Sequence, residues 1–232
     1  MTGAVINKRR IAIAVARKDL TIEWNSRILV NQVAPFAAIV MVLFAFALDN
    51  DGILLRVAPG LVWLATLFSM LVVVQRSFTV ESADGALDAL RVAGVDMGPI
   101  FVGKAVALMV QLFVLELMLV ATAVVLYGVE MTLAGFCEAI VTLVVATIGL
   151  GSVGTLYGGL AAGARGRETL LPLLLLPAVA PVLIGATRAT EAAFGSGGTT
   201  VSEGWPWIGL LLVFAVLFSA VGTVAFGPLV DE

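Results

Sequence analysis

Six long apolar runs dominate this sequence of 232 residues. Each run is long enough, or nearly so, to cross the roughly 30 Å hydrocarbon core of a lipid bilayer as a helix. Charged residues make up only 12 % of the chain, whereas a soluble domain has roughly 25 %. The sequence therefore predicts an all-α, polytopic membrane protein that forms one integral membrane domain over residues 1–232. The six predicted spans are 30–48, 53–75, 100–127, 132–160, 168–187 and 207–229.

Lysine and arginine are distributed unevenly between the two sides of this predicted bundle. Of the 13 such residues, only Arg56 and Arg188 fall on the side that holds the connections after spans one, three and five. Connections in the cytoplasm are enriched in lysine and arginine, so we predict that both termini are cytoplasmic. The formal net charge of −3 gives no indication of nucleic-acid binding.

Residues 5–27 precede the first span and mix basic with apolar side chains, among them Ile13, Leu20 and Trp24. This mixture is typical of a helix that lies along a membrane surface, where tryptophan and arginine both find partners. We therefore expect an interfacial helix on the cytoplasmic side. The alternative is a basic tail that only fixes the orientation of the chain.

Several kinds of chemistry are absent from the sequence. There is no histidine and a single cysteine, Cys137, so the chain offers no imidazole for zinc, for haem or for a Ser-His-Asp triad. A G-x-x-x-x-G-K-[ST] loop is also missing, so the chain cannot hold ATP by that motif. We therefore identify no catalytic residues and no metal site in the sequence.

An acidic segment, RSFTVESADGALDALRVAG at residues 76–94, interrupts the apolar sequence between spans two and three. On a helix over 81–93 one face carries charges, those of Glu81, Asp84, Asp88 and Arg91. Another face carries Leu87 and Leu90. Gly85 and the like charges at positions 84 and 88 weaken such a helix. These residues fit equally well a helix that docks into a cationic groove of a partner and a solvated loop.

Span three contains two polar residues, Gln111 and Glu116. An ionised carboxylate at mid-membrane is costly, so Glu116 should be protonated, paired or in contact with water. It could mark a dimer interface or a translocation path, but we favour a neutral carboxyl bonded within the bundle, because no basic partner lies in another predicted span. Glu130 and Glu138 are expected to reach the outer headgroups, and we assign them no role.

Glycine and proline set expectations for spans four and five. The run GLGSVGTLYGGLAAGARG contains two glycine pairs at a spacing of four residues, Gly154 with Gly158 and Gly159 with Gly163. This spacing is typical of close helix packing in membranes. In span five, the prolines at 172, 177 and 181 are expected to break or kink the helix, which leaves open whether the span crosses fully.

Three stretches resemble one family. The acidic segment matches F-x-x-D-x-x-D-G-x-L-x-x-L through Phe78, Glu81, Asp84, Gly85, Leu87 and Leu90, with glutamate in place of the first aspartate. The second span begins with A-P-G-x-x-W, at Ala58, Pro59, Gly60 and Trp63. The fifth carries L-P-x-x-x-P-x-L-I-x-A, with Pro177 and Pro181. In this order, from about residue 15 to the end, the chain is similar to permeases of the ABC-2 exporter type and most closely to the cytochrome c maturation B proteins, also called haem exporter B permeases.

The resemblance implies a non-catalytic membrane subunit with no directly bound cofactor, and it implies partners. The acidic segment would be the coupling helix that touches a separate ATPase subunit through Phe78, Glu81, Asp84, Gly85, Leu87, Asp88, Leu90 and Arg91. Two permease copies and two ATPase copies would work together in the cell (plasma or inner) membrane with a haem-handling membrane protein and a haem chaperone. ATP would be used by the partner, for haem delivery or for release of the haem-loaded chaperone.

Two other functions stay open at this point. One is an ABC-2-type permease that exports another cargo, such as a lipid, a drug or a polysaccharide. The other is a self-contained secondary transporter or membrane enzyme. The second alternative is disfavoured, because the sequence has a single acid at mid-span and no histidine.

Overall fold

The computed structural model describes residues 8–48, 50–84, 94–162 and 167–230, and the regular structure in these ranges is helical throughout. The long helices are α1 (Lys8–Ser26), α2 (Ala34–Ala47), α3 (Asp51–Asp84), α5 (Met97–Tyr127), α6 (Leu133–Ala162), α7 (Arg167–Phe194) and α8 (Trp205–Val230). Shorter turns are the π-helical η1 (Leu29–Val33) and the 3₁₀-helical η2 (Ser196–Gly198) and η3 (Val201–Glu203). The prediction of an all-α protein is confirmed.

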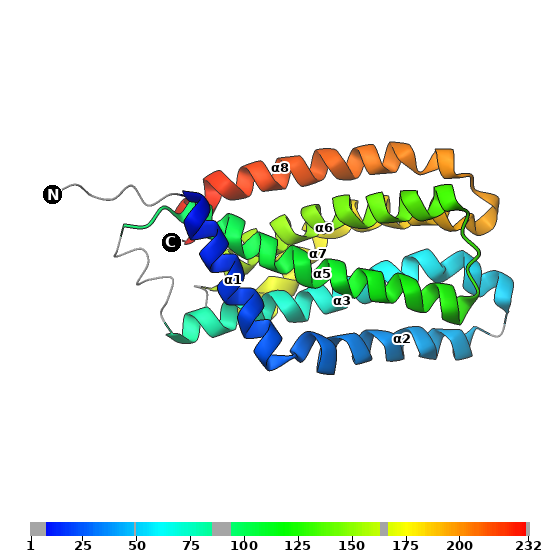
Figure 1. The fold of residues 1–232 in the computed structure, drawn as a ribbon, viewed down its shortest axis with the longest axis horizontal. Coiled ribbons are helices and arrows are strands. Elements are labelled where there is room, and N and C mark those ends of the chain that lie inside the picture. Colours follow the sequence, from blue (N-terminus) through cyan, green and yellow to red (C-terminus); the bar gives the residue numbers. More distant parts are fainter. Residues whose placement is uncertain (1–7, 49, 85–93, 163–166, 231–232) are drawn as a thin grey trace.

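Six helical segments are long and apolar enough to cross a membrane, which confirms the predicted number of spans. They are Leu29–Ala47, Gly52–Thr79, Met97–Tyr127, Leu133–Ala162, Leu170–Phe194 and Val201–Leu229. They lie side by side as one bundle, and α1 crosses obliquely over the end of the bundle where α1 begins and α8 ends (Figure 1). We call this end of the bundle the terminal end.

Two helices differ from their predicted limits. α3 has 34 residues, about 51 Å at 1.5 Å per residue, and it continues past the predicted end of span two through Asp84. The first residues of the acidic segment therefore prolong the second span. α7 runs through Pro172, Pro177 and Pro181 as one helix of 28 residues, so the prolines do not interrupt it and its length is sufficient to cross the bilayer.

Caps fix the connection from α5 to α6 and the start of α5. The Asp96 carboxylate accepts a hydrogen bond from the Gly98 N–H at 3.0 Å, as an N-cap residue does. Gly128 ends α5 in the left-handed region at φ 65°, where glycine has no steric penalty. Thr132 then accepts from the Gly135 N–H at 3.1 Å.

α6 lies against α3, α5, α7 and α8, and its glycines permit the close approach. A Cβ added to Gly154 would lie 2.7 Å from the Met70 side chain, and one added to Gly158 would lie 2.5 Å from the Phe78 ring. Gly159 faces Phe226 in the same way. Gly163 lies outside the described residues. Backbone-to-side-chain contacts of this kind hold membrane helices together without a hydrophobic driving force.

Candidate functional site: an ionic cluster beneath α1

Helix α1 directs its acids toward the bundle. Asp19 and Glu23 are four residues apart and therefore share one face of the helix. Both line a small cavity whose other walls come from α3 and α5. We define the α1 cluster as the five polar residues that line this cavity, namely Asp19, Glu23, Arg76, Ser77 and Gln111, together with Lys104, which contacts Asp19 and Ser77.

Lys104 is the central cation of the α1 cluster. It lies on α5, two turns after the start of the helix, and its side chain is only 1 % exposed. The ammonium nitrogen lies 3.3 Å from Oδ2 of Asp19, 3.5 Å from Oγ of Ser77 and 4.5 Å from the centre of the Phe78 ring. A buried charge is tolerated only when it is paired and hydrogen-bonded, so this lysine joins α1, α3 and α5.

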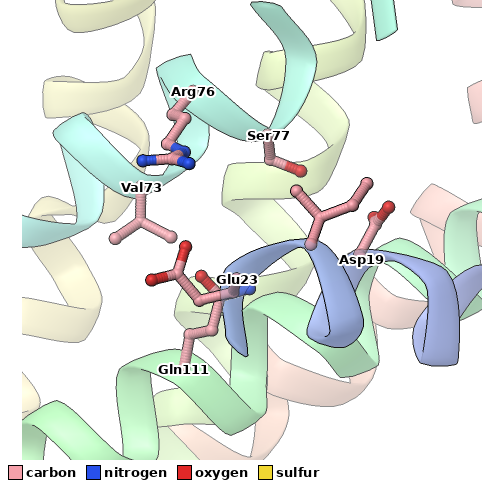
Figure 2. A pocket seen from close by; sticks show the side chains of 7 residues that line it. Asp19, Glu23, Val73, Arg76, Ser77 and Gln111 are labelled. Carbon is pink, nitrogen blue, oxygen red and sulfur yellow. The ribbon is translucent and has the colours of Figure 1, made fainter. Parts of the chain in front are cut away.

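The cavity beside Lys104 has a volume of about 30 Å³, which is enough for a water molecule. The side chains of Arg76, Glu23 and Gln111 point into it (Figure 2). The Nη1 atom of Arg76 is buried and has no hydrogen-bond partner among the described residues. The Arg76 guanidinium lines the same cavity as the carboxylates of Asp19 and Glu23.

Glu23 also holds the corner between α1 and the first span. One of its carboxylate oxygens accepts a hydrogen bond from the backbone N–H of Leu29 at 2.6 Å, at the start of η1. Between them Arg27 has φ 53°, in the left-handed region that residues with side chains rarely adopt. The α1 cluster therefore also fixes the direction in which the chain enters the bundle.

A second ion pair anchors the other end of α1. The Lys8 ammonium lies 2.7 Å from the Asp96 carboxylate. This hydrogen bond from Lys8 and the one from the Gly98 N–H lower the pKa of Asp96 below its ordinary value of 3.8. Between the two anchors, Gly103 lies directly beneath the Ala12 carbonyl and the Val15 side chain. α1 is thus bound to α5 near both of its ends.

Most of the predicted coupling residues lie outside the described part of the chain. Gly85, Leu87, Asp88, Leu90 and Arg91 belong to the range 85–93, which the structure does not describe. Glu81 and Asp84 lie in the last two turns of α3. Phe78 is buried, with its ring against Lys104 and Gly158. The two ends of the acidic segment are therefore described: residues 76–84 are the last part of α3, and Gly94 lies two residues before Asp96, the N-cap of α5.

The two span motifs lie elsewhere in the bundle. Ala58 and Trp63 are buried on α3, and the Trp63 indole N–H donates to the Thr190 hydroxyl of α7 at 2.9 Å. Gly60, between them, faces Thr187 of α7. Pro59 is buried as well, and Pro177 and Pro181 are exposed along α7. Trp63 and Gly60 therefore contribute to α3–α7 packing, whereas Pro177 and Pro181 face outward, and none of the motif residues lines the cavity of the α1 cluster.

The structure separates Gln111 from Glu116. Glu116 is fully buried in the bundle, where the Thr147 hydroxyl donates to one of its oxygens at 2.5 Å, whereas Gln111 lines the cavity of the α1 cluster. The expectation that Glu138 reaches headgroups is wrong. Its side chain is completely buried against Gly204, because the connection before α8 folds back over α6. Glu130 is exposed.

Sequence reasoning missed five members of the α1 cluster, namely Asp19, Glu23, Arg76, Ser77 and Lys104. One signal was present: Lys104 stands inside a run that is otherwise apolar from residue 97 to residue 115 except for Gln111. A cation in that position needs a partner. The partner itself is 85 residues away in the sequence, so no local pattern identifies it.

The fold and this site define a polytopic helical membrane protein with a charged cluster at one end of its bundle. A family model described as "CcmB protein" matches residues 10–231, and the chain belongs to this family. The chain is 28 % identical over 219 residues to "Heme exporter protein B" of Haemophilus influenzae, which covers 94 % of both chains.

Two further relatives carry the same name. "Heme exporter protein B" of Rhodobacter capsulatus is 34 % identical over 164 residues, covering 69 % of this chain and 73 % of the relative. The protein of that name from Pseudomonas aeruginosa is 31 % identical over 193 residues, or 78 % of each chain. The resemblance inferred from three short motifs is therefore confirmed over most of the chain.

Proposed function

We propose that this chain is the permease subunit of an ABC transporter complex for cytochrome c maturation. In this proposal a separate ATPase subunit hydrolyses ATP, and the energy serves haem delivery or the release of a haem-loaded chaperone. The observation that carries the proposal is the family match over residues 10–231, together with relatives whose names describe haem export. This chain has no P-loop, so the nucleotide would be bound by its partner.

The acidic segment between α3 and α5 would be the contact with the ATPase. Its leucines, Leu87 and Leu90, would fill an apolar groove, and its carboxylates would face cations at the rim of that groove. A displacement of this segment by the ATPase would be transmitted to α3 just after Phe78 and to α5 at Asp96.

The α1 cluster supports this mechanical role. Lys104 links α5 to Asp19 of α1 and to Ser77 of α3, and Lys8 links the start of α1 to Asp96. Because packed and paired elements move as units, a displacement of the acidic segment would shift α1, α3 and α5 together. Glu23 would carry the movement on to the first span through Leu29.

The proposed assembly contains two copies of this chain and two copies of the ATPase. A haem-handling membrane protein and a haem chaperone would complete it. The complex would lie in the cell inner membrane with both termini of this chain in the cytoplasm, which follows from the excess of lysine and arginine on that side. The terminal end of the bundle would then face the ATPase.

Co-purification tests the proposal. The tagged full-length chain, extracted from its own cells in a mild detergent, should recover an ATPase subunit. Changing Leu87 and Leu90 together to glutamate should reduce that recovery strongly. The matched control changes Leu133 to glutamate, because this leucine is 82 % exposed at the opposite end of the bundle. If the wild-type chain never recovers an ATPase under gentle conditions, the proposal fails.

The cargo needs a separate experiment. A strain that lacks this chain should fail to mature its c-type cytochromes. Normal c-type cytochromes in that strain, with no gene for a haem chaperone nearby, would favour the alternative, an ABC-2-type permease for a lipid, a drug or a polysaccharide.

A further inference from the structure

Beyond its first two residues, Lys8 and Arg9, which lie beside the start of α5, helix α1 carries its acids and its bases on different faces. Its two acids, Asp19 and Glu23, face the bundle, whereas basic residues lie on the opposite, exposed face. We propose that this exposed face binds the phosphate headgroups of anionic phospholipids in the adjacent leaflet. We define the outer face of α1 by the residues that carry the argument, namely Arg10, Ile13, Arg17, Lys18, Thr21 and Trp24.

Helical geometry brings these residues onto one face. Arg10, Arg17 and Trp24 follow one another at intervals of seven residues, which is two turns of an α-helix. Ile13 and Thr21 lie beside that line. All five of these residues are exposed, and the two apolar ones are exposed to an unusual degree, Ile13 by 65 % and Trp24 by 79 %. Exposed apolar side chains surrounded by polar residues are typical of a surface that contacts a membrane or another molecule.

The position of α1 indicates lipid as the neighbour. α5 has 31 residues, or about 46 Å, so its ends extend beyond the roughly 30 Å hydrocarbon core into the headgroup region. α1 packs on the terminal part of α5, from Asp96 to Gln111. The first span begins at Leu29, five residues after Trp24. The outer face of α1 is therefore at the depth where the chain enters the membrane.

The chemistry of the outer face fits a phospholipid headgroup. The residues Arg10, Ile13, Arg17, Lys18 and Thr21 surround a shallow, open hollow. A guanidinium binds two phosphate oxygens at once, a hydroxyl adds a further donor, and Ile13 and Trp24 suit the upper acyl chains. Lys18 lies 3.2 Å from Asp19, so the two arginines supply most of the attraction. This inference does not depend on the proposed cargo or on the ATPase.

Lipid selectivity of the purified full-length chain tests the proposal. The chain is reconstituted in phosphatidylcholine bilayers with trace spin-labelled phosphatidylglycerol or spin-labelled phosphatidylcholine. The fraction of each probe immobilised at the protein is then measured. We expect a preference for phosphatidylglycerol of at least about threefold, given the attraction of each arginine to an anionic surface. Added inorganic phosphate should leave this preference unchanged, and high salt should reduce it.

Two matched double variants identify the surface. Arg10→Gln with Arg17→Gln should remove most of the preference. Arg56→Gln with Arg188→Gln removes two exposed arginines from the opposite end of the bundle and should leave most of the preference in place. An equal loss in both variants, or no preference in the wild-type chain, overturns the proposal. Gel filtration and circular dichroism establish that both variants are folded.

A local probe distinguishes lipid binding at the outer face of α1 from lipid binding elsewhere on the chain. In a Cys137→Ser background, a fluorophore attached through Thr21→Cys reports on the outer face of α1. We expect headgroup-nitroxide phosphatidylglycerol to quench it more than headgroup-nitroxide phosphatidylcholine does. Equal quenching by the two lipids would contradict the proposal. This is also the result expected if the outer face of α1 binds a protein partner and not lipid.

Discussion

The ammonium of Lys104 lies 3.3 Å from the carboxylate of Asp19, and this pair joins α5 to α1 through two residues that are 85 positions apart in the sequence. The lysine is 1 % exposed and the aspartate 10 % exposed. This pair holds α1 against the end of the bundle, at the level where α3 leads into the acidic segment. Its position explains how a surface helix, a span and the proposed coupling segment share one anchor.

Loss of Asp19 should destabilise the protein strongly. Asp19→Asn removes the carboxylate that lies 3.3 Å from the buried Lys104 ammonium, and breaking a buried pair on one side costs about 3–5 kcal/mol. The measurement is thermal unfolding in detergent, followed by gel filtration. The double variant Asp19→Asn with Lys104→Met should recover most of the loss, because no buried charge remains. An unchanged melting temperature in Asp19→Asn would contradict the role of the pair.

Gly158 should not tolerate a side chain. In Gly158→Ala the new methyl group would lie 2.5 Å from the Phe78 ring, so α6 or Phe78 must shift at a cost of about 1–3 kcal/mol. Thermal unfolding measures this cost. Gly209→Ala is the matched control, because a Cβ there meets nothing within 4 Å. Equal losses of stability in the two variants would contradict the close contact between Gly158 and Phe78.

The hydrogen bond from the Trp63 indole to Thr190 should contribute measurably to the stability of the α3–α7 contact. Thr190→Val keeps the shape of the side chain but leaves the buried indole N–H without its acceptor, at a cost of about 1–3 kcal/mol. Thermal unfolding again supplies the measurement. Thr21→Val is a suitable control, since Thr21 is exposed. A melting temperature for Thr190→Val equal to that of the control would refute this prediction.

The Lys8–Asp96 pair should stabilise the start of α5 at every pH above about 5. Because the pKa of Asp96 is lowered in the folded chain, its contribution is fully present above the ordinary value of 3.8 and is lost as the pH falls through the folded-state pKa. Protection of α1 from proteolysis, compared between the wild type and Asp96→Asn, measures the difference. A difference that changes between pH 5 and pH 8 would show that another group is responsible.

The sequence predicted the spans well and the site only in part. Membrane helices are recognisable in a sequence for two reasons. In lipid, a helix satisfies its own backbone hydrogen bonds, and the side chains that cross the hydrocarbon core form a long apolar run. The α1 cluster was missed because Asp19 and Lys104 meet only through the path of α1 across α5. Glu138 was misjudged for a similar reason: its burial depends on Gly204, which is contributed by a connection much later in the chain. The role of residues 85–93 stays a prediction.

Site-specific cross-linking from the acidic segment tests the central claim most directly. In a Cys137→Ser background, one chain carries a single cysteine through Leu90→Cys and another carries one through Leu133→Cys, at the opposite end of the bundle. After labelling with a photo-activated cross-linker in native membranes, we predict an adduct between the Leu90→Cys chain and a separate ATPase subunit, with none from Leu133→Cys. An ATPase adduct from neither position, or equally from both, would contradict the proposed coupling.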